Sequence, residues 1–198
     1  GNTLRIRNIS VSLTQRELSA NSLKNEFYLM SQGILIVGHG LAGAILAHSL
    51  LKCGRNVRVI DSNSSHSATQ ASAGLINPFI GPKLNMPSDF DRCMDACLSF
   101  CKMIEKHAEQ KFLHSIELFR VFQAVTQKDR WDSMPSPYKK KTISSEQCSD
   151  SGLLANYGAG VTKAWKLDSQ GFINFSKESL SAQDRFQETS FDPKKWTD

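Results

Sequence analysis

Short apolar runs and longer periodic segments alternate along the chain, which indicates strands followed by helices. Residues 34–37 form a continuous apolar run rich in β-branched side chains, the pattern of a strand buried on both faces of a parallel sheet. Residues 44–53 are good helix formers and are followed by Gly54, a residue favoured just after a helix end. Residues 56–60 are again β-rich. This order predicts a βαβ unit and an α/β fold.

The pattern changes after residue 87. Residues 90–108 place apolar side chains, including three cysteines, at steps of three and four, so they predict an amphipathic helix with Ser88 and Asp91 as its capping box. Residues 116–125 and 158–167 predict strands. Short helices are expected after Thr126 and after Asn174, each acting as a cap. Residues 139–141 are three lysines that follow two prolines, and we expect them in a solvated loop.

Composition then narrows the class of protein. Hydrophobic residues make up 40% and charged residues 22% of the 198 residues, as in globular domains. No stretch approaches the roughly 20 uninterrupted apolar residues that cross a bilayer, so we expect no membrane span. The net charge of +5 is spread along the chain, and we do not expect a nucleic acid partner. Five cysteines without a C-x-x-C pair predict reduced thiols, no metal site and a cytoplasmic location.

A glycine-rich loop connects the first predicted strand to the first predicted helix. Residues 38–43 read Gly-His-Gly-Leu-Ala-Gly, the pattern G-x-G-x-x-G. Gly38 permits a tight turn, Gly40 lets the backbone approach a pyrophosphate, and Gly43 lets the helix pack close to the strand. The free N–H groups and the positive end of the helix then stabilise the phosphate charge.

An acid follows the second predicted strand, as a dinucleotide site requires. Asp61 lies 18 residues beyond Gly43, and its carboxylate can accept hydrogen bonds from ribose hydroxyls. A carboxylate at this place would repel a 2′-phosphate, which disfavours NADP. The unit alone does not distinguish FAD from NAD. His39 lies at an x position of the loop, and we expect its side chain to face solvent or the adenosine.

The segment after Asp61 carries a resemblance that separates the two cofactors. Residues 61–78 form a Ser/Thr-rich polar loop that leads into Ser-Ala-Gly-Leu at residues 72–75. This arrangement resembles the D-amino acid oxidase-like family of FAD-dependent oxidoreductases, in which such a loop and an Ala-Ala-Gly-Leu-like element follow the ribose-binding acid. The resemblance is specific over residues 33–82. It implies a Rossmann-like FAD-binding domain with a parallel sheet, interleaved with the beginning of a mixed α+β substrate domain.

The resemblance also implies the contacts of the cofactor, FAD. Hydroxyl groups in the loop would donate to phosphate, and small residues at 72–74 would let the backbone approach the flavin. Ala68 stands where the family often has a hydroxyl residue, so one phosphate contact is missing. The predicted FAD-binding residues are Gly38, Gly40, Leu41, Ala42, Gly43, Asp61, Ser62, Ser67, Thr69, Ala73, Gly74 and Leu75.

The same resemblance divides the chain. We expect residues 1–29 to lie outside the fold, because they lack a sustained apolar period. Residues 30–110 would form the FAD-binding βαβ unit and its following helix, residues 111–170 the start of the substrate domain, and residues 171–198 a return toward the FAD domain. Members of the family are considerably longer, so we interpret the chain as an N-terminal part that lacks most of the substrate pocket.

The predicted function is FAD-dependent oxidation of a C–N bond in a small amine or amino acid, which gives an imine. No catalytic residue is nominated, because the cofactor performs the difficult step and the protein positions the substrate. Three alternatives remain open: an NAD-linked dehydrogenase, a nucleotide-binding fragment without turnover, and an FAD-dependent tRNA-modifying domain.

Overall fold

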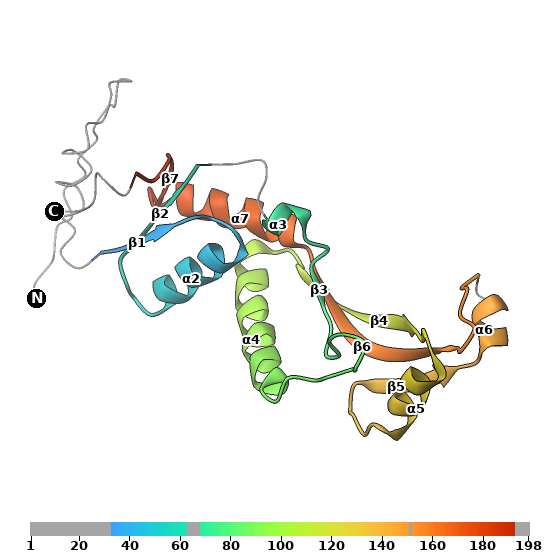
Figure 1. Ribbon diagram of the computed structural model, residues 1–198. Helices are drawn as coiled ribbons and strands as arrows, with labels where there is room; N and C mark the ends of the chain where they lie inside the picture. Colours follow the sequence, from blue (N-terminus) through green and yellow to red (C-terminus); the bar gives the residue numbers. More distant parts are fainter. Residues whose placement is uncertain (1–32, 63–67, 151, 193–198) are drawn as a thin grey trace, which may run out of the picture.

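The computed structural model describes residues 33–62, 68–150 and 152–192, which form two sheets with helices around them (Figure 1). The expected extension at residues 1–29 and the predicted phosphate contact Ser67 lie outside the described residues. The elements are β1 (Ile34–Val37), α2 (Leu41–Lys52), β2 (Val57–Asp61), α3 (Ala68–Ala71), β3 (Leu75–Ile76), α4 (Phe90–Ala108), β4 (Leu113–Val121), α5 (Val125–Ser133), β5 (Lys139–Ile143), α6 (Ser145–Asp150), β6 (Ala159–Leu167), α7 (Ser169–Ser181) and β7 (Phe186–Glu188).

The first sheet is parallel and has the order β1-β2-β7. The predicted βαβ unit is confirmed, since β1 pairs with β2 and α2 connects them. Ile36 and Val59 point to the same side of the sheet, where they pack against Ala47 of α2 and Leu180 of α7. Both helices therefore cover one face. The third strand, β7, comes from the end of the described chain and pairs with the outer edge of β2.

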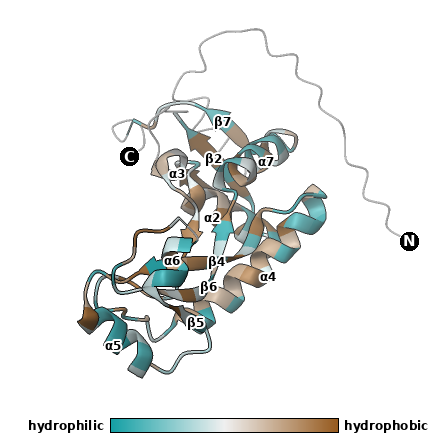
Figure 2. Ribbon diagram, turned by 90° about the vertical axis from the view of Figure 1, so that its right-hand side faces the viewer, coloured by the Kyte–Doolittle hydropathy of each residue, from teal (hydrophilic) through white to brown (hydrophobic). Residues whose placement is uncertain are grey.

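The second sheet is antiparallel and is built around β6. All nine residues of β6 pair with β4 along one edge, while β3 and β5 share the other edge. Side chains of β6 are mostly buried, whereas α5 and α6 at the far end of this sheet are largely hydrophilic (Figure 2). The α/β fold with a parallel sheet is confirmed, and a mixed α+β part accompanies it.

The long helix α4 joins the two parts of the molecule. Met94 and Cys101 pack on Trp165 of β6, while Ile104 packs on α2 and α7. The predicted amphipathic helix is therefore confirmed. The expected apolar position of Cys93 is wrong, because this thiol is exposed and lies near the Asp89 carboxylate.

Two of the predicted caps of the helices are wrong by position. The residue before α4 is Asp89, not Ser88, and α7 begins at Ser169 rather than after Asn174. The carboxylate of Asp168 accepts a hydrogen bond from Gly171 N at 2.9 Å and caps α7. Because Asp168 directly follows β6, the chain turns from strand to helix without a loop.

The third predicted cap and the lysine triplet also need correction. Thr126 lies inside α5, whose preceding residue is Ala124. The three lysines start β5 rather than a solvated loop. The ammonium group of Lys139 donates to carbonyl oxygens at the end of α5, including that of Trp131 at 2.5 Å and that of Met134 at 3.1 Å. A cation at a helix C-terminus stabilises the negative end of the helix, so packing against α5 turns this lysine inward.

Candidate cofactor site

The glycine loop has the shape that a dinucleotide site needs. Gly38 has φ of +101°, a left-handed conformation that favours glycine, and it forms the turn between β1 and α2. A Cβ on Gly43 would lie 2.0 Å from the carbonyl oxygen of Gly38, so only glycine allows α2 to pack this close to the turn. A Cβ on Gly40 would lie 3.2 Å from Oγ1 of Thr69 and would narrow the space above the loop. These three observations fit the chemical roles expected of a pyrophosphate cradle.

The N-terminus of α2 presents a positive end to this cradle. Gly40 precedes the helix and gives no side-chain cap, and the first turn contains no acidic residue. The N–H of Leu41 donates to Oγ1 of Thr69 at 2.9 Å, while Ala42 is exposed beside it. A hydroxyl that accepts this bond can still donate its own hydrogen to a phosphate oxygen. The structure thus brings the predicted phosphate contact Thr69 to the helix end, although its contact with FAD stays a prediction.

Asp61 lies at the carboxyl end of β2, next to the glycine loop. Its Oδ2 accepts a hydrogen bond from the backbone N–H of His39 at 2.6 Å. Its backbone carbonyl accepts one from Thr189 N at 2.9 Å, just beyond β7. A carboxylate has two oxygens with about four acceptor sites, so Asp61 can hold the loop and also accept ribose hydroxyls. Ser62 follows it in an exposed position.

The expectation for His39 is wrong, because its side chain faces neither solvent nor an open adenosine site. Only 7% of the residue is exposed. Its Nε2 lies 2.9 Å from Oγ of Ser176, and its ring meets the edge of Phe186 at a centroid distance of 5.1 Å. Both partners come from α7 and β7, more than 130 positions later in the sequence. No local pattern at the loop could have shown these contacts.

The predicted flavin neighbours connect the cradle to the second sheet. Oγ of Ser72 donates to the carbonyl of Thr69 at 3.0 Å. Gly74 has φ of +66°, and a Cβ there would lie 2.0 Å from the carbonyl oxygen of Leu167. The glycine therefore allows close packing on β6, a structural requirement separate from any flavin. Ala73 is exposed, and Leu75, 47% exposed, starts β3. Their role beside the flavin stays a prediction.

A cavity of about 530 Å³, lined by both polar and apolar side chains, adjoins these residues. Ser72 and Ala73 form one side of it, and the end of β6 with the first residues of α7 forms the other. His114 and Lys166, which are paired across β4 and β6, also line it. The cavity places polar groups at the junction of the two sheets, next to the loop that would hold a flavin.

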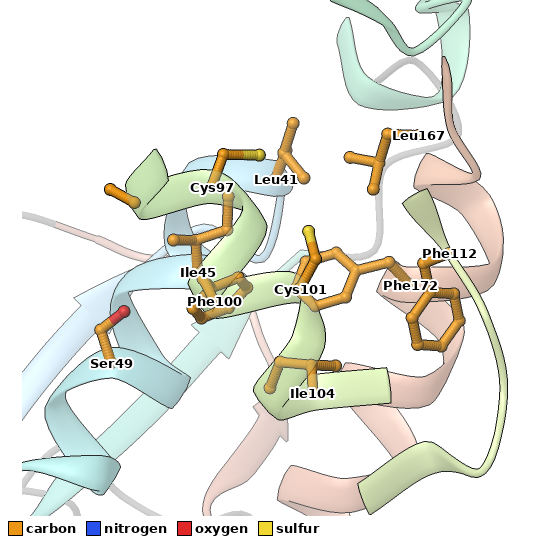
Figure 3. Close-up of a pocket in the computed structure, with 11 residues that line it drawn as sticks. Leu41, Ile45, Ser49, Cys97, Phe100, Cys101, Ile104, Phe112, Leu167 and Phe172 are labelled. Atoms are coloured by element: carbon orange, nitrogen blue, oxygen red, sulfur yellow. The ribbon is translucent and has the colours of Figure 1, made fainter. Parts of the chain in front are cut away.

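A second cavity, of about 310 Å³, lies between α2, α4 and α7 and is lined almost wholly by apolar side chains (Figure 3). Cys97 and Cys101 of α4 point toward it together with Phe100 and Leu41. A hydrogen bond from Cys101 lowers the pKa of the Cys97 thiol to about 7, while the same bond and burial raise that of Cys101. Within the described part of the chain, no group of three or more metal-ligating side chains is present.

Comparisons with known proteins agree with this geometry. Residues 33–114 match the family model of the FAD binding domain. An uncharacterized oxidoreductase, YurR of Bacillus subtilis (strain 168), is 41% identical over 51 residues, which are 26% of this chain and 14% of that protein. Iminodiacetate oxidase from Chelativorans sp. BNC1 has a similar structure, with a TM-score of 0.60 and 15% identity, over 79% of this chain and 47% of that chain. Glycine oxidase from Bacillus cereus ATCC 14579 gives a TM-score of 0.60 and 15% identity, over 79% and 46%.

The fold and the site define a class of domain, that of FAD-binding domains. Residues 33–114 form an FAD-binding domain, and the cofactor of this domain is FAD rather than NAD. The fold is shared with solved oxidases, in agreement with the resemblance to the D-amino acid oxidase-like family. The chain spans about half the length of those structures. Across the residues that the structure describes, no helix combines the length and apolar character needed to cross a membrane.

Proposed function

We propose that this chain binds FAD and belongs to an enzyme that oxidises a C–N bond of a small amine or amino acid. The observation that carries the proposal is the combination of the glycine cradle with an antiparallel sheet that starts directly from the predicted flavin loop. The same combination of a parallel and an antiparallel part supports the likeness to iminodiacetate oxidase and to glycine oxidase. A bound flavin would accept two electrons and a proton from the substrate, which leaves an imine, and would pass the electrons to oxygen or another acceptor.

The residues of this chain would hold and orient the cofactor. The α2 N-terminus and Thr69 would hold the diphosphate, since backbone N–H groups and a hydroxyl face the same space. Asp61 would accept the ribose hydroxyls. Ala73 and Leu75 would lie beside the flavin, with Gly74 anchoring this loop to β6. The cavity at the sheet junction would then place Lys166 on the substrate side, where its ammonium group suits a carboxylate, with His114 beside it.

Flavin uptake tests the first part of the proposal. The full chain is mixed with FAD, desalted, and examined by visible absorption. We expect flavin bands that survive desalting in the wild type and are lost in Gly40→Val, whose branched side chain would point at Thr69 and fill the cradle. Leu46→Val is the matched control, because Leu46 is 48% exposed on α2 and away from the loop. Uptake of NAD without FAD, or undiminished uptake by Gly40→Val, would contradict the assignment.

Anaerobic reduction tests the second part. Glycine, iminodiacetate and a panel of other amino acids and amines are added to the FAD-loaded chain, and bleaching of the flavin bands is followed. Bleaching by an amine, together with an imine or its hydrolysis product, supports the proposed reaction. Stable FAD uptake with no bleaching by any amine indicates that this chain binds the cofactor without turnover, and the proposal then fails for the chain by itself.

A further inference from the structure

A buried chain of polar groups connects the glycine loop to α7. Oγ of Ser176 lies 2.9 Å from Nε2 of His39 and 3.0 Å from Nε2 of His48. Ser176 is fully buried. His48 stacks on Phe175 at a centroid distance of 6.2 Å with an interplanar angle of 16°. One hydroxyl of α7 thus joins a loop residue to a residue of α2, over sequence separations of 137 and 128.

We propose that His39 is a positioning residue for FAD, which acts through Ser176 and His48 to fix the glycine loop and Asp61. This inference rests on the proposed FAD site. The backbone of His39 donates to Asp61 at 2.6 Å, and its ring is held by Ser176 and Phe186. Both ends of the residue are therefore anchored. The backbone N–H of His39, which donates to the Asp61 carboxylate, lies near the start of the glycine loop, the segment that would approach the diphosphate.

The charges around the chain favour neutral imidazoles. Burial lowers the pKa of His39 and of His48, and although Asp61 opposes this effect at His39, Lys177 adds to it. At His48, electrostatic interaction with His39 and His107 lowers the pKa in the same direction as burial. A neutral imidazole can both donate and accept at its two nitrogens, so each ring can bond to one hydroxyl without placing charge in a buried site.

A double-mutant cycle on FAD affinity tests the inference. His39→Ala and Ser176→Ala are each expected to raise the Kd for FAD about tenfold, because each removes hydrogen bonds that hold the loop. The double variant is expected to bind FAD no more weakly than either single variant, since both changes break the same hydrogen bond between His39 and Ser176. Additive effects of about a hundredfold, or unchanged affinity in folded variants, would overturn the inference.

Two controls in α7 separate positioning from general destabilisation. Leu180→Ala removes a fully buried side chain that packs on the parallel sheet and does not bond to the loop. It is expected to lower the melting temperature more than Ser176→Ala does, yet to leave the Kd within about twofold. Ser181→Ala, at the exposed end of α7, should change neither. An equal loss of affinity in Leu180→Ala would show that His39 matters only for helix packing. No FAD uptake by the wild type would instead overturn the proposed function.

Discussion

Replacement of Gly43 by alanine is the sharpest test of the nucleotide-binding geometry. The new Cβ would lie 2.0 Å from the carbonyl oxygen of Gly38, whereas real Cβ atoms essentially never come closer than 3.0 Å to such an atom. The atoms that the new Cβ would meet, the carbonyl oxygen and carbon of Gly38, belong to the backbone, so no side chain can move aside to relieve the contact. The helix α2 must therefore shift by about 1.0 Å from the turn. Helix propensity alone would favour alanine by about 1 kcal/mol. Overpacking typically costs about 1–3 kcal/mol, and occasionally more.

We therefore expect Gly43→Ala to lower the free energy of unfolding by up to about 2 kcal/mol and to weaken FAD binding at least tenfold. The loss of affinity follows because the shift moves the N–H groups of the first turn away from the diphosphate. Urea denaturation and flavin fluorescence titration give the two quantities. Ala42→Gly is the propensity control, since it costs about 1 kcal/mol in a helix without a steric contact. A stabilised Gly43→Ala variant with unchanged FAD affinity would refute the reasoning.

Four further outcomes follow from other parts of the structure. Trp131→Ala should lower the free energy of unfolding by about 3–5 kcal/mol in chemical denaturation, because this ring is fully buried in the cluster at α5. Glu105→Ala should cost about 1–3 kcal/mol and Glu105→Gln clearly less, because Oε1 accepts two backbone N–H groups at the start of β4, each at 2.8 Å, and glutamine keeps an acceptor. Iodoacetamide should label Cys97 with a rate that rises through a midpoint near pH 7, as mass spectrometry of peptides can show. The contribution of His39 and His48 to the unfolding free energy should be constant well above pH 6.5 and should fall below it, because the unfolded chain has the ordinary pKa of 6.5 while burial lowers both pKa values in the folded chain, which therefore binds fewer protons; a rise in unfolding free energy as the pH falls below 6.5 would contradict this.

The elements that depend on local pattern could be predicted from the sequence. The apolar run at residues 34–37, the glycines at 38, 40 and 43, and the period of α4 each act within a few residues. Their structural roles follow from backbone sterics and from burial of one face, which the residue types reveal directly. The FAD assignment needed the resemblance at residues 61–78, because the βαβ geometry is common to several dinucleotides.

Features that depend on distant partners could not be predicted. The burial of His39 requires Ser176 and Phe186, and the inward turn of Lys139 requires the carbonyls of α5. Gly74 shows the same limit, since the requirement for glycine there is imposed by Leu167 of β6. The caps of α4, α5 and α7 are predicted at the wrong residues, because capping patterns recur by chance near polar residues and only the conformation of the chain that enters the helix decides among them.

The pairing of β2 with β7 has a consequence for how the protein folds during its synthesis on the ribosome. Asp61 and Glu188 are partners in register although they lie 127 positions apart, so most of the chain must be synthesised before this contact can form. Until β7 has emerged, β2 keeps an open edge and the carbonyl of Asp61 lacks the hydrogen bond from Thr189. Long-range closure of this kind slows folding. A nascent chain that ends before Phe186 should therefore fail to retain flavin, even though its glycine loop is complete.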